Sequence, residues 1–481
     1  RPLDPSNPRT LLMRMLINAG SEEIGFRSDS FDLIIIGGGP GGVAAAIRGV
    51  QLGAKAAIVE GTHWGGFCLN RACVPTKLFA ATLDRVKTVQ TAAKMGFSKA
   101  EAVVDPAAVF KMKDELVGYF SMGTEGLVKV KGVTPIKGKG RLAGPGRVAV
   151  GDHVYQARSV ILGVGAQWAR PAFPGADLEG VINSSQFLEE GQIPGRSLIL
   201  GASPWAIELA QFLGACGSQV VVAVRERGIL PEFDAEIGQR LRGALKGDPL
   251  TILNSCQVVS IAKEKDGLAV VLSVKGKEET RPFDRVIYFD RRPAIADLGL
   301  DTVGLKDLCV DEHLATRASG IWALGDAVGK EPFLSHGATA MGIIAAENAL
   351  GAKRAFNPNT VPRMAFTNPQ AASVGLSEDQ AEDAGYDVLS GTVAIAASPM
   401  AMIQGVGSGV VKVVGEKKYG ELLGVHILAP FATEIIGAAA LAIQMEATLE
   451  DLARCALPHP TIAESLADAA REALGWAIYI P

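Results

Sequence analysis

The chain reads FDLIIIGGGPGGVAAAIRG from residue 31 to residue 49. A short apolar run stops in glycines and continues into an alanine-rich segment, which is the pattern of a buried parallel strand that enters a helix. The glycines follow the spacing G-x-G-x-x-G, with Gly37, Gly39 and Gly42 in the three glycine places. At such a turn the backbone can approach a pyrophosphate, whose charge is stabilised by the helix N-terminus. The stretch therefore predicts a dinucleotide-binding domain.

An acidic residue follows this turn at the distance that a dinucleotide site requires. Residues 56–59 form an apolar run that reads as the second strand, and Glu60 comes directly after it. A carboxylate in this place can accept hydrogen bonds from ribose hydroxyls. A plain glycine turn is the alternative, but the complete series of strand, turn, helix, strand and acid favours the nucleotide site.

The same order of elements recurs near the middle of the chain. Residues 196–200 read as a strand, residues 206–213 as a helix and residues 219–224 as the next strand. The turn between them begins at Gly201 but carries Ser203 and an alanine in the other two glycine places. Small residues still permit a close approach to phosphate, so we expect a second dinucleotide-binding domain. A degenerate domain that binds no nucleotide remains the alternative.

The remaining segments complete these domains and add a third. Residues 79–120 look helical, and residues 133–160 alternate like antiparallel strands separated by glycine turns. From residue 361 onward, short strands precede a long helix at residues 432–445, which indicates an α+β unit. We therefore predict an α/β protein with two Rossmann-like domains and a C-terminal α+β domain.

Composition excludes several other classes of protein. A chain of 481 residues suggests about three domains, and its formal net charge of -4 gives no electrostatic reason to bind nucleic acid or an anionic membrane. Its apolar runs fall short of the roughly 20 residues that span a bilayer, so we expect a soluble protein. Six scattered cysteines do not form a secreted disulfide scaffold, which points to a reducing compartment such as the cytoplasm or an organelle matrix. Residues 1–30 carry no secretory apolar core and are treated as an extension of unassigned role.

The most informative stretch is GGFCLNRACVPTK at residues 65–77. Cys68 and Cys73 lie five positions apart, just after the first dinucleotide unit. Zinc is a poor alternative. A four-ligand site would need two further Cys or His ligands, and only His63 lies nearby in sequence. Two inert structural thiols are the usual reading of an arbitrary cysteine pair. The surroundings of this pair favour redox chemistry instead, and no metal site is predicted.

This stretch resembles the signature of the pyridine nucleotide-disulfide oxidoreductases, approximately G-G-T-C-x-N-x-G-C-x-P-S-K. The chain departs from it by Phe67 in place of Thr, Ala72 in place of Gly and Thr76 in place of Ser. The resemblance implies an FAD enzyme that oxidises a reduced nicotinamide nucleotide. It further implies that Cys73 lies next to the flavin and that Cys68 exchanges with the substrate. Lys77 then resembles the lysine near the flavin, and Glu208 its partner from the second nucleotide domain.

Other segments fit the same family. Gly163-Val164-Gly165 stands where the family has an A-T-G turn, and Gly325-Asp326 matches a G-D motif whose aspartate binds the ribityl chain of FAD. The resemblance thus implies FAD contacts at Gly37, Gly39, Gly42, Glu60, Gly66, Gly165 and Asp326, and nicotinamide nucleotide contacts at Gly201, Ser203 and Arg225. Residues 457–464, LPHPTIAE, resemble the H-P-T-x-x-E signature. His459 would be the acid-base that serves Cys68, and Glu464 would orient it. Because the family supplies this histidine from the opposite subunit, a homodimer is implied.

Two positions bear on the nucleotide. Val224 stands where NADH-dependent relatives tend to have an acid, and Arg225 resembles the arginine that meets the 2'-phosphate of NADPH. NADPH is therefore favoured over NADH, although a pair of solvated surface arginines, Arg225 and Arg227, is the alternative. Pro204 replaces the tyrosine that gates the nicotinamide pocket in many relatives.

The substrate is narrowed by comparison within the family. Ile47 stands where glutathione reductases have an arginine, and the chain keeps His459 but has no terminal cysteine pair like that of mercuric reductases. We therefore expect a dihydrolipoamide dehydrogenase-like enzyme. A mercuric-reductase-like or other small-disulfide reductase using NADPH, and a non-catalytic flavoprotein or structural subunit, are the alternatives. The expected domains are an extension (1–30), an FAD domain in two parts (31–190 and 316–360), an NAD(P) domain (191–315) and an interface domain (361–481).

Overall fold

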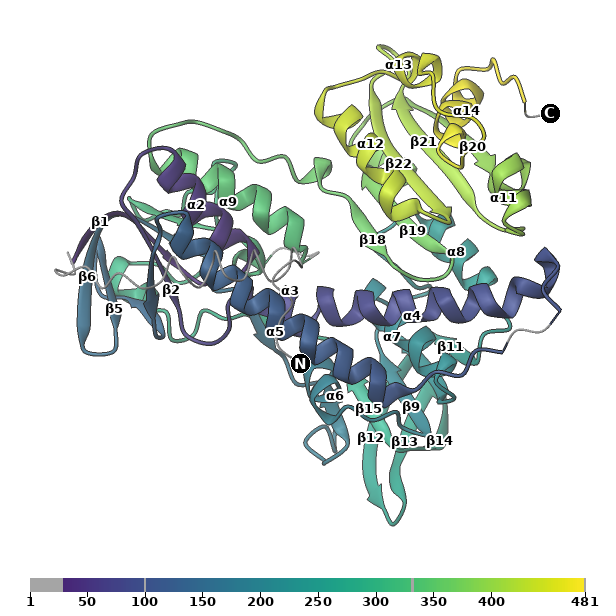
Figure 1. The fold of residues 1–481 in the computed structure, drawn as a ribbon, viewed down its shortest axis with the longest axis horizontal. Coiled ribbons are helices and arrows are strands. Elements are labelled where there is room, and N and C mark those ends of the chain that lie inside the picture. Colours follow the sequence, from purple (N-terminus) through teal and green to yellow (C-terminus); the bar gives the residue numbers. More distant parts are fainter. Residues whose placement is uncertain (1–28, 99–100, 330–332, 480–481) are drawn as a thin grey trace, which may run out of the picture. The chain divides into compact units, whose positions relative to one another are not determined.

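The computed structural model describes residues 29–98, 101–329 and 333–479 (Figure 1). The expected N-terminal extension lies almost entirely outside the described residues. The chain divides into two compact units. The first holds the described parts of Arg1–Pro75, Lys111–Ala169 and Asp290–Pro358, and the second holds those of Thr76–Phe110, Arg170–Phe289 and Asn359–Pro481.

The first unit is built around one mixed sheet. Strands β1 (Ser30–Ile36), β2 (Ala56–Glu60) and β3 (Thr134–Lys137) are parallel, and β6 (His153–Leu162) joins the other edge of β1. The sheet continues with β5 (Arg147–Val150) and β4 (Gly140–Leu142), which run antiparallel, while β17 (Ile321–Ala323) pairs in parallel with β6. β1 is buried along most of its length because apolar clusters cover both faces of the sheet. This confirms the buried strand predicted at residues 31–36.

Two helices of this unit lie side by side, α2 (Pro40–Gln51) and α9 (Ser335–Ala349) (Figure 1). α2 follows β1 after the glycine turn, and α9 follows β17 and the short turn η3 (Gly325–Val328). A two-stranded antiparallel sheet of β7 (Ala166–Trp168) and β16 (Arg291–Pro293) also belongs to this unit. The turns after β1 and β17 therefore lead into packed neighbouring helices.

The second unit contains the repeat of the strand-turn-helix pattern. Its parallel sheet has the order β11 (Leu250–Asn254), β10 (Gln219–Val224), β9 (Arg196–Leu200), β15 (Arg285–Tyr288) and β8 (Val181–Asn183). The helices of this region are α6 (Ser184–Glu190), α7 (Pro204–Ala215) and α8 (Ala235–Ala244). An antiparallel sheet of β12 (Cys256–Glu264), β13 (Gly267–Val274) and β14 (Lys277–Phe283) follows, which the sequence interpretation did not include.

The C-terminal part of the second unit is an antiparallel sheet with helices. The strands follow the order β18 (Arg363–Ala365), β19 (Gln370–Gly375), β22 (Leu422–Ala429), β21 (Val410–Glu416) and β20 (Val388–Ala394). The helices are α10 (Glu378–Asp383), α11 (Pro399–Ile403), α12 (Ala432–Gln444), α13 (Leu449–Arg454) and α14 (Glu464–Ala473). An apolar cluster between the sheet and the helices forms the core. The predicted fold class, α/β with a C-terminal α+β region, is confirmed.

Two element predictions are corrected. The helical stretch expected at residues 79–120 is two helices, α4 (Cys73–Thr91) and α5 (Pro106–Val130). The first ends through a 3-10 turn at Gly96, whose φ of 91° a helix cannot continue, and the second begins at a proline. The expectation of antiparallel strands over residues 133–160 is wrong for β3, which runs parallel to β2. Period-two alternation predicts a strand but not its direction.

Within the part of the chain that the structure describes, no helix combines the length and the apolar character needed to cross a bilayer.

Candidate active site

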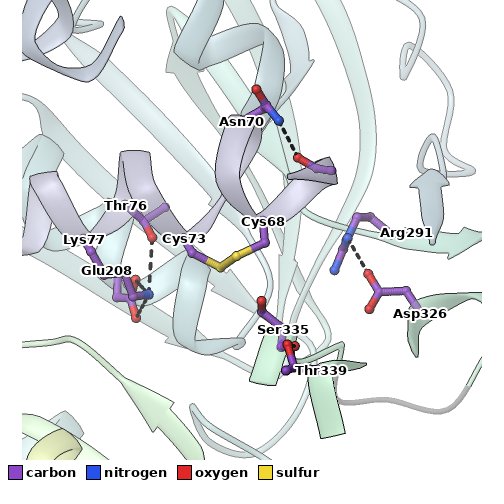
Figure 2. Close-up of a disulfide and its surroundings, with 11 residues drawn as sticks. Cys68, Asn70, Cys73, Thr76, Lys77, Glu208, Arg291, Asp326, Ser335 and Thr339 are labelled. Atoms are coloured by element: carbon purple, nitrogen blue, oxygen red, sulfur yellow. Dashed lines mark hydrogen bonds and ion pairs between the residues drawn. A yellow bond between two sulfur atoms is a disulfide. The ribbon is translucent and has the colours of Figure 1, made fainter. Parts of the chain in front are cut away.

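The two cysteines of the predicted redox pair are joined by a disulfide (Figure 2). Cys68 lies in the short helix α3 (Gly66–Arg71), and Cys73 is the first residue of α4. The Asn70 side chain donates hydrogen bonds to the carbonyl oxygens of Trp64 and Gly66, at 3.0 and 2.8 Å. Figure 2 draws one of the two. These bonds fix α3 from inside its own turn. The two cysteines thus lie on consecutive helices.

Gly66 brings the cysteine segment against the first glycine turn. Its φ is 60°, and a Cβ at this position would come within 2.7 Å of the Cα of Gly39. A larger side chain would separate the two segments, because the atom that it would meet belongs to the backbone of Gly39. The disulfide segment and the predicted pyrophosphate-binding turn are therefore neighbours in the same unit.

The first glycine turn fits a dinucleotide. A Cβ at Gly42 would approach the carbonyl oxygen of Gly37 to 1.9 Å, so only glycine allows the turn to close. Helix α2 begins after Gly39, and no side chain caps it. Its first backbone N–H groups therefore remain available to a phosphate. These features are what an FAD pyrophosphate requires.

Glu60 lies at the end of β2, where a ribose-binding carboxylate was predicted. Its Oε2 accepts the N–H of Gly38 at 2.6 Å. Its Oε1 accepts the N–H and the hydroxyl of Thr62 at 2.6 and 2.9 Å, and the N–H of His63 at 3.1 Å. The carboxylate is thus oriented by the turn itself, and ribose hydroxyls would have to share or replace some of these bonds.

Asp326 lies in η3 and forms an ion pair that sequence reasoning missed. Its Oδ2 is 2.9 Å from the Nη1 of Arg291 (Figure 2). Burial raises the pKa of Asp326, while the charge and the hydrogen bond of Arg291 act to lower it. The only sequence signal for Arg291 is the short basic run Arg291-Arg292 after a buried strand. Arginines in such a run usually lie exposed to solvent on a surface loop.

Lys77 and Glu208 form the second predicted pair. The Nζ of Lys77 lies 3.2 and 3.0 Å from the two carboxylate oxygens of Glu208 (Figure 2). Lys77 is one turn beyond Cys73 in α4, and Glu208 is a buried residue of α7. The helix that begins at a redox cysteine thus carries a lysine whose charge is fixed by a carboxylate.

The second glycine turn is open at Gly201, but unlike the first it leads into a helix that carries a side-chain cap. Gly201 has a φ of 119° with open space on its Cβ side, and Ser203 caps α7 by accepting the N–H of Ala206 at 3.4 Å. Arg225 follows β10 and is exposed. Gly165, from the altered A-T-G segment, has a φ of 71° and likewise faces open space.

The third pair is His459 and Glu464. The Nδ1 of His459 is 2.8 Å from Oε1 of Glu464, and Oε2 accepts the N–H of Thr461 at 2.8 Å. Burial raises the pKa of Glu464, but the bonds from Thr461 and His459 outweigh it and leave the pKa lower than usual. The imidazole is mostly exposed. Because its Nδ1 faces Glu464, its Nε2 faces away from that carboxylate. No cluster of three or more metal-binding side chains occurs among the described residues.

Comparison with known proteins identifies the class. Residues 31–342 match the family model of pyridine nucleotide-disulphide oxidoreductases, and residues 361–470 match the dimerisation domain of the same family. The chain belongs to this family and is a flavin enzyme of the NAD(P)H-dependent disulfide oxidoreductase type. The family predicted from the cysteine motif is therefore confirmed.

Among its relatives, the chain is similar to dihydrolipoyl dehydrogenases. It is 37% identical to that of Thermus scotoductus over 462 residues, which cover 94% of this chain and 99% of the relative. It is 32% identical to the mitochondrial dihydrolipoyl dehydrogenase of Pisum sativum over 460 residues, or 92% of this chain and 91% of the relative. A leghemoglobin reductase of Vigna unguiculata is 32% identical over 461 residues, covering 92% and 87% of the two chains. The crystal structure of LpdA from Mycobacterium tuberculosis shares the fold, with a TM-score of 0.83 at 24% identity over 91% of this chain and 99% of that one.

Proposed function

We propose that this protein is an NAD(P)H-dependent oxidoreductase that acts on a lipoamide-type disulfide or dithiol through Cys68 and Cys73. The observation that carries the proposal is the disulfide between these residues, in a segment that touches the first glycine turn. FAD, when bound, accepts a hydride from the reduced nicotinamide and passes two electrons to the disulfide. In the opposite direction a dithiol substrate reduces the disulfide. The relatives named dihydrolipoyl dehydrogenase support a lipoamide-type substrate.

The residues that would hold FAD are those of the first unit. The backbone of Gly37, Gly39 and Gly42 would bind the pyrophosphate at the N-terminus of α2. Glu60 would accept bonds from the ribose, and Asp326 from the ribityl chain. Gly66 and Gly165 would line the same site through their backbone. Lys77, fixed by Glu208, belongs to the second unit and is the lysine that the family resemblance assigns to the flavin, whose reduced, more anionic state a positive charge would favour.

The cysteines carry out the exchange with the substrate. Reduction of the disulfide by two electrons gives two thiols, and the Cys68 thiolate attacks one sulfur of an oxidised substrate. The substrate disulfide breaks, a mixed disulfide with Cys68 forms, and the leaving sulfur takes a proton. Cys73 then attacks Cys68, releases the second substrate thiol and restores the enzyme disulfide. His459 supplies and removes these protons, and Glu464 keeps its imidazole oriented.

The site is complete only with two subunits in this proposal. The dimerisation domain matched at residues 361–470 supports a homodimer, and the partner subunit would supply His459. Helix α12 and the residues directly before and after it present exposed apolar side chains, among them Phe431, Leu441 and Met445, which suit a surface that a second copy covers.

The preferred nucleotide is inferred from the end of β10, and the compartment from the free cysteines. Val224 provides no carboxylate for a ribose 2'-hydroxyl, whereas Arg225 is exposed at the end of β10. This arrangement favours NADPH over NADH, with Gly201 and Ser203 binding its phosphates. The scattered free cysteines suit a reducing compartment such as the cytoplasm.

Anaerobic titration tests the proposal. The purified protein should be yellow, and NADPH should bleach it at lower concentration than NADH does. The reduced enzyme should then transfer electrons to lipoamide faster than to glutathione disulfide. A colourless protein that takes up no FAD would contradict the function. A yellow protein that reduces no disulfide would contradict the role of the cysteines.

A further inference from the structure

A buried arginine contacts two aromatic rings and the predicted flavin carboxylate. The Cζ of Arg291 is 4.2 Å from the ring centroid of Phe67 and 4.9 Å from that of Phe333. Its Nη1 is 2.9 Å from Oδ2 of Asp326, and its side chain is only 8% exposed. The guanidinium therefore lies over two rings and forms an ion pair through Nη1.

The stack is fixed by its own neighbours. The ring of Phe67 meets that of Trp168 edge-on, with 5.4 Å between centroids. Trp168 is also the register partner of Arg291 in the β7–β16 ladder. We call Phe67, Trp168, Arg291, Asp326 and Phe333 the Arg291 cluster. Because Phe67 directly precedes Cys68, the cluster reaches from the redox segment to the carboxylate in η3.

Arg291 and Asp326 compensate each other for the loss of water around their charges. A buried guanidinium loses its hydration, and an aromatic face together with a carboxylate replaces what is lost. Burial raises the pKa of the Asp326 carboxyl, and Arg291 is the side chain that opposes this rise. Among the described residues, the other ionisable side chains on the two elements that pack most closely on η3 are Arg292 of β16 and His336 and Glu347 of α9. Removal of Arg291 would leave a buried carboxylate without its cation.

We propose that Arg291 is a positioning residue of the flavin site, which the rings of Phe67 and Phe333 hold so that its ion pair keeps Asp326 aimed as an acceptor for a hydroxyl of FAD. The inference rests on the proposed contact between Asp326 and FAD. It also gives a reason for Phe67, at which the chain departs from the threonine of the family signature. A threonine has no ring to stack on the guanidinium, so restoring the family residue should harm this protein.

Titration of the apoprotein with FAD from pH 5.5 to pH 9 tests this, with flavin fluorescence as the readout. Arg291→Met should weaken FAD binding at pH 7 by about tenfold or more, the size of effect expected for a lost charge-assisted arrangement. The loss should be greatest at low pH and recover as pH rises, because the Asp326 carboxyl now ionises at higher pH. Arg291→Lys restores the cation and should return most of the affinity and the wild-type pH profile.

The remaining variants separate positioning from simple damage to the fold. Phe67→Thr and Phe67→Leu should each weaken FAD binding by about fivefold through the lost cation–π contact. Asp326→Asn in the Arg291→Met background should remove the pH dependence. Arg292→Met is the matched control, since Arg292 is an exposed arginine of the same strand, and it should bind FAD like the wild type.

The outcomes are distinct. If Arg291→Met is too unstable to assay, Arg291→Lys and Phe67→Leu carry the test through their affinity and pH profile. A uniform loss at every pH that lysine does not rescue would overturn the inference, as would wild-type affinity in Arg291→Met and both Phe67 variants. Failure of the wild-type apoprotein to bind FAD would instead count against the proposed function.

Discussion

The Nζ of Lys77 lies 3.0 Å from Oε2 of Glu208, although the two residues are 131 positions apart in the sequence. The contact is reinforced by the C-terminal region of the same unit. The N–H of Phe366 donates to Oε1 of Glu208 at 2.8 Å, and the Nζ of Lys77 lies 4.3 Å from the ring centroid of Phe366. One carboxylate thus fixes a lysine of α4 and the segment that follows β18.

This shared carboxylate predicts different outcomes for two substitutions. Glu208→Ala should lower the free energy of unfolding by about 1–3 kcal/mol, because the N–H of Phe366 loses its acceptor. Glu208→Gln keeps an acceptor oxygen and should cost less. Both should slow flavin reduction by NADPH by about tenfold to a hundredfold, since Lys77 loses its fixed position. Chemical denaturation and stopped-flow absorbance measure the two effects. Equal stability of the two variants would argue against the shared acceptor.

The cysteine roles predict a spectroscopic difference. Cys68→Ser should lower disulfide reduction by about a thousandfold or more, because the thiol that is proposed to attack the substrate is lost. A long-wavelength charge-transfer absorbance should persist in this variant through the Cys73 thiolate, and should be absent from Cys73→Ser. Cys309→Ser, at an exposed free cysteine, is the control and should retain full activity. Full turnover in Cys68→Ser would end the cysteine mechanism.

The histidine pair predicts a kinetic loss without loss of flavin. His459→Gln should reduce turnover with lipoamide by about 10²–10⁴, the usual contribution of a general acid-base. Glu464→Gln should give a smaller loss, because His459 remains but its Nδ1 is no longer held by a carboxylate. Both variants should still be bleached by NADPH at the wild-type rate. Steady-state and half-reaction kinetics separate the two steps, and slowed bleaching would place His459 elsewhere in the cycle.

Nucleotide preference is tested at Arg225. Arg225→Ala should raise the KM for NADPH by about tenfold or more through the lost charge-assisted bonds, and should leave the KM for NADH nearly unchanged. Arg242→Ala removes an exposed arginine of α8 and serves as the control. If the KM values for NADPH and NADH change equally, Arg225 does not read the 2'-phosphate.

Local patterns predicted those parts of the molecule that local chemistry determines. Each glycine turn is contiguous in sequence with the strand that precedes it, and the two cysteines lie five positions apart. Both strands and the cysteine pair lie where expected. Resemblance to the family supplied the pairing of Lys77 with Glu208, which spacing alone does not indicate. The pairing of His459 with Glu464 likewise came from the family resemblance, although the two residues lie only five positions apart.

Contacts between distant segments could not be predicted in the same way. Arg291 is buried because β16 pairs with β7 and brings it under Phe67, and no local pattern marks that pairing. Phe67 itself looked like a simple departure from a signature. Its role depends on a guanidinium more than two hundred residues later in the chain, so it could be found only in three dimensions.

A buried histidine outside the candidate site predicts how stability depends on pH. The Nδ1 of His426 lies 3.0 Å from Oγ of Ser373, and its Nε2 lies 3.0 Å from the carbonyl oxygen of Leu376. A neutral ring satisfies both contacts, with Nε2–H as donor and Nδ1 as acceptor for the hydroxyl. Burial lowers the pKa of His426 from 6.5 to about 4. The cations Lys412 and Arg363 lower the pKa further, whereas Asp234 and the Leu376 carbonyl raise it.

The sign of the effect follows from this difference in proton binding. Below about pH 6.5 the unfolded chain protonates this histidine while the folded chain does not, so stability falls as pH decreases toward about 4. The slope for one such group is about 1.4 kcal/mol per pH unit. His426→Gln can still donate to the Leu376 carbonyl but does not titrate, so its stability should decline less steeply over this range. Urea denaturation at fixed protein concentration between pH 7 and pH 5 measures both slopes. Parallel slopes for the two proteins would mean that His426 is already protonated in the folded state.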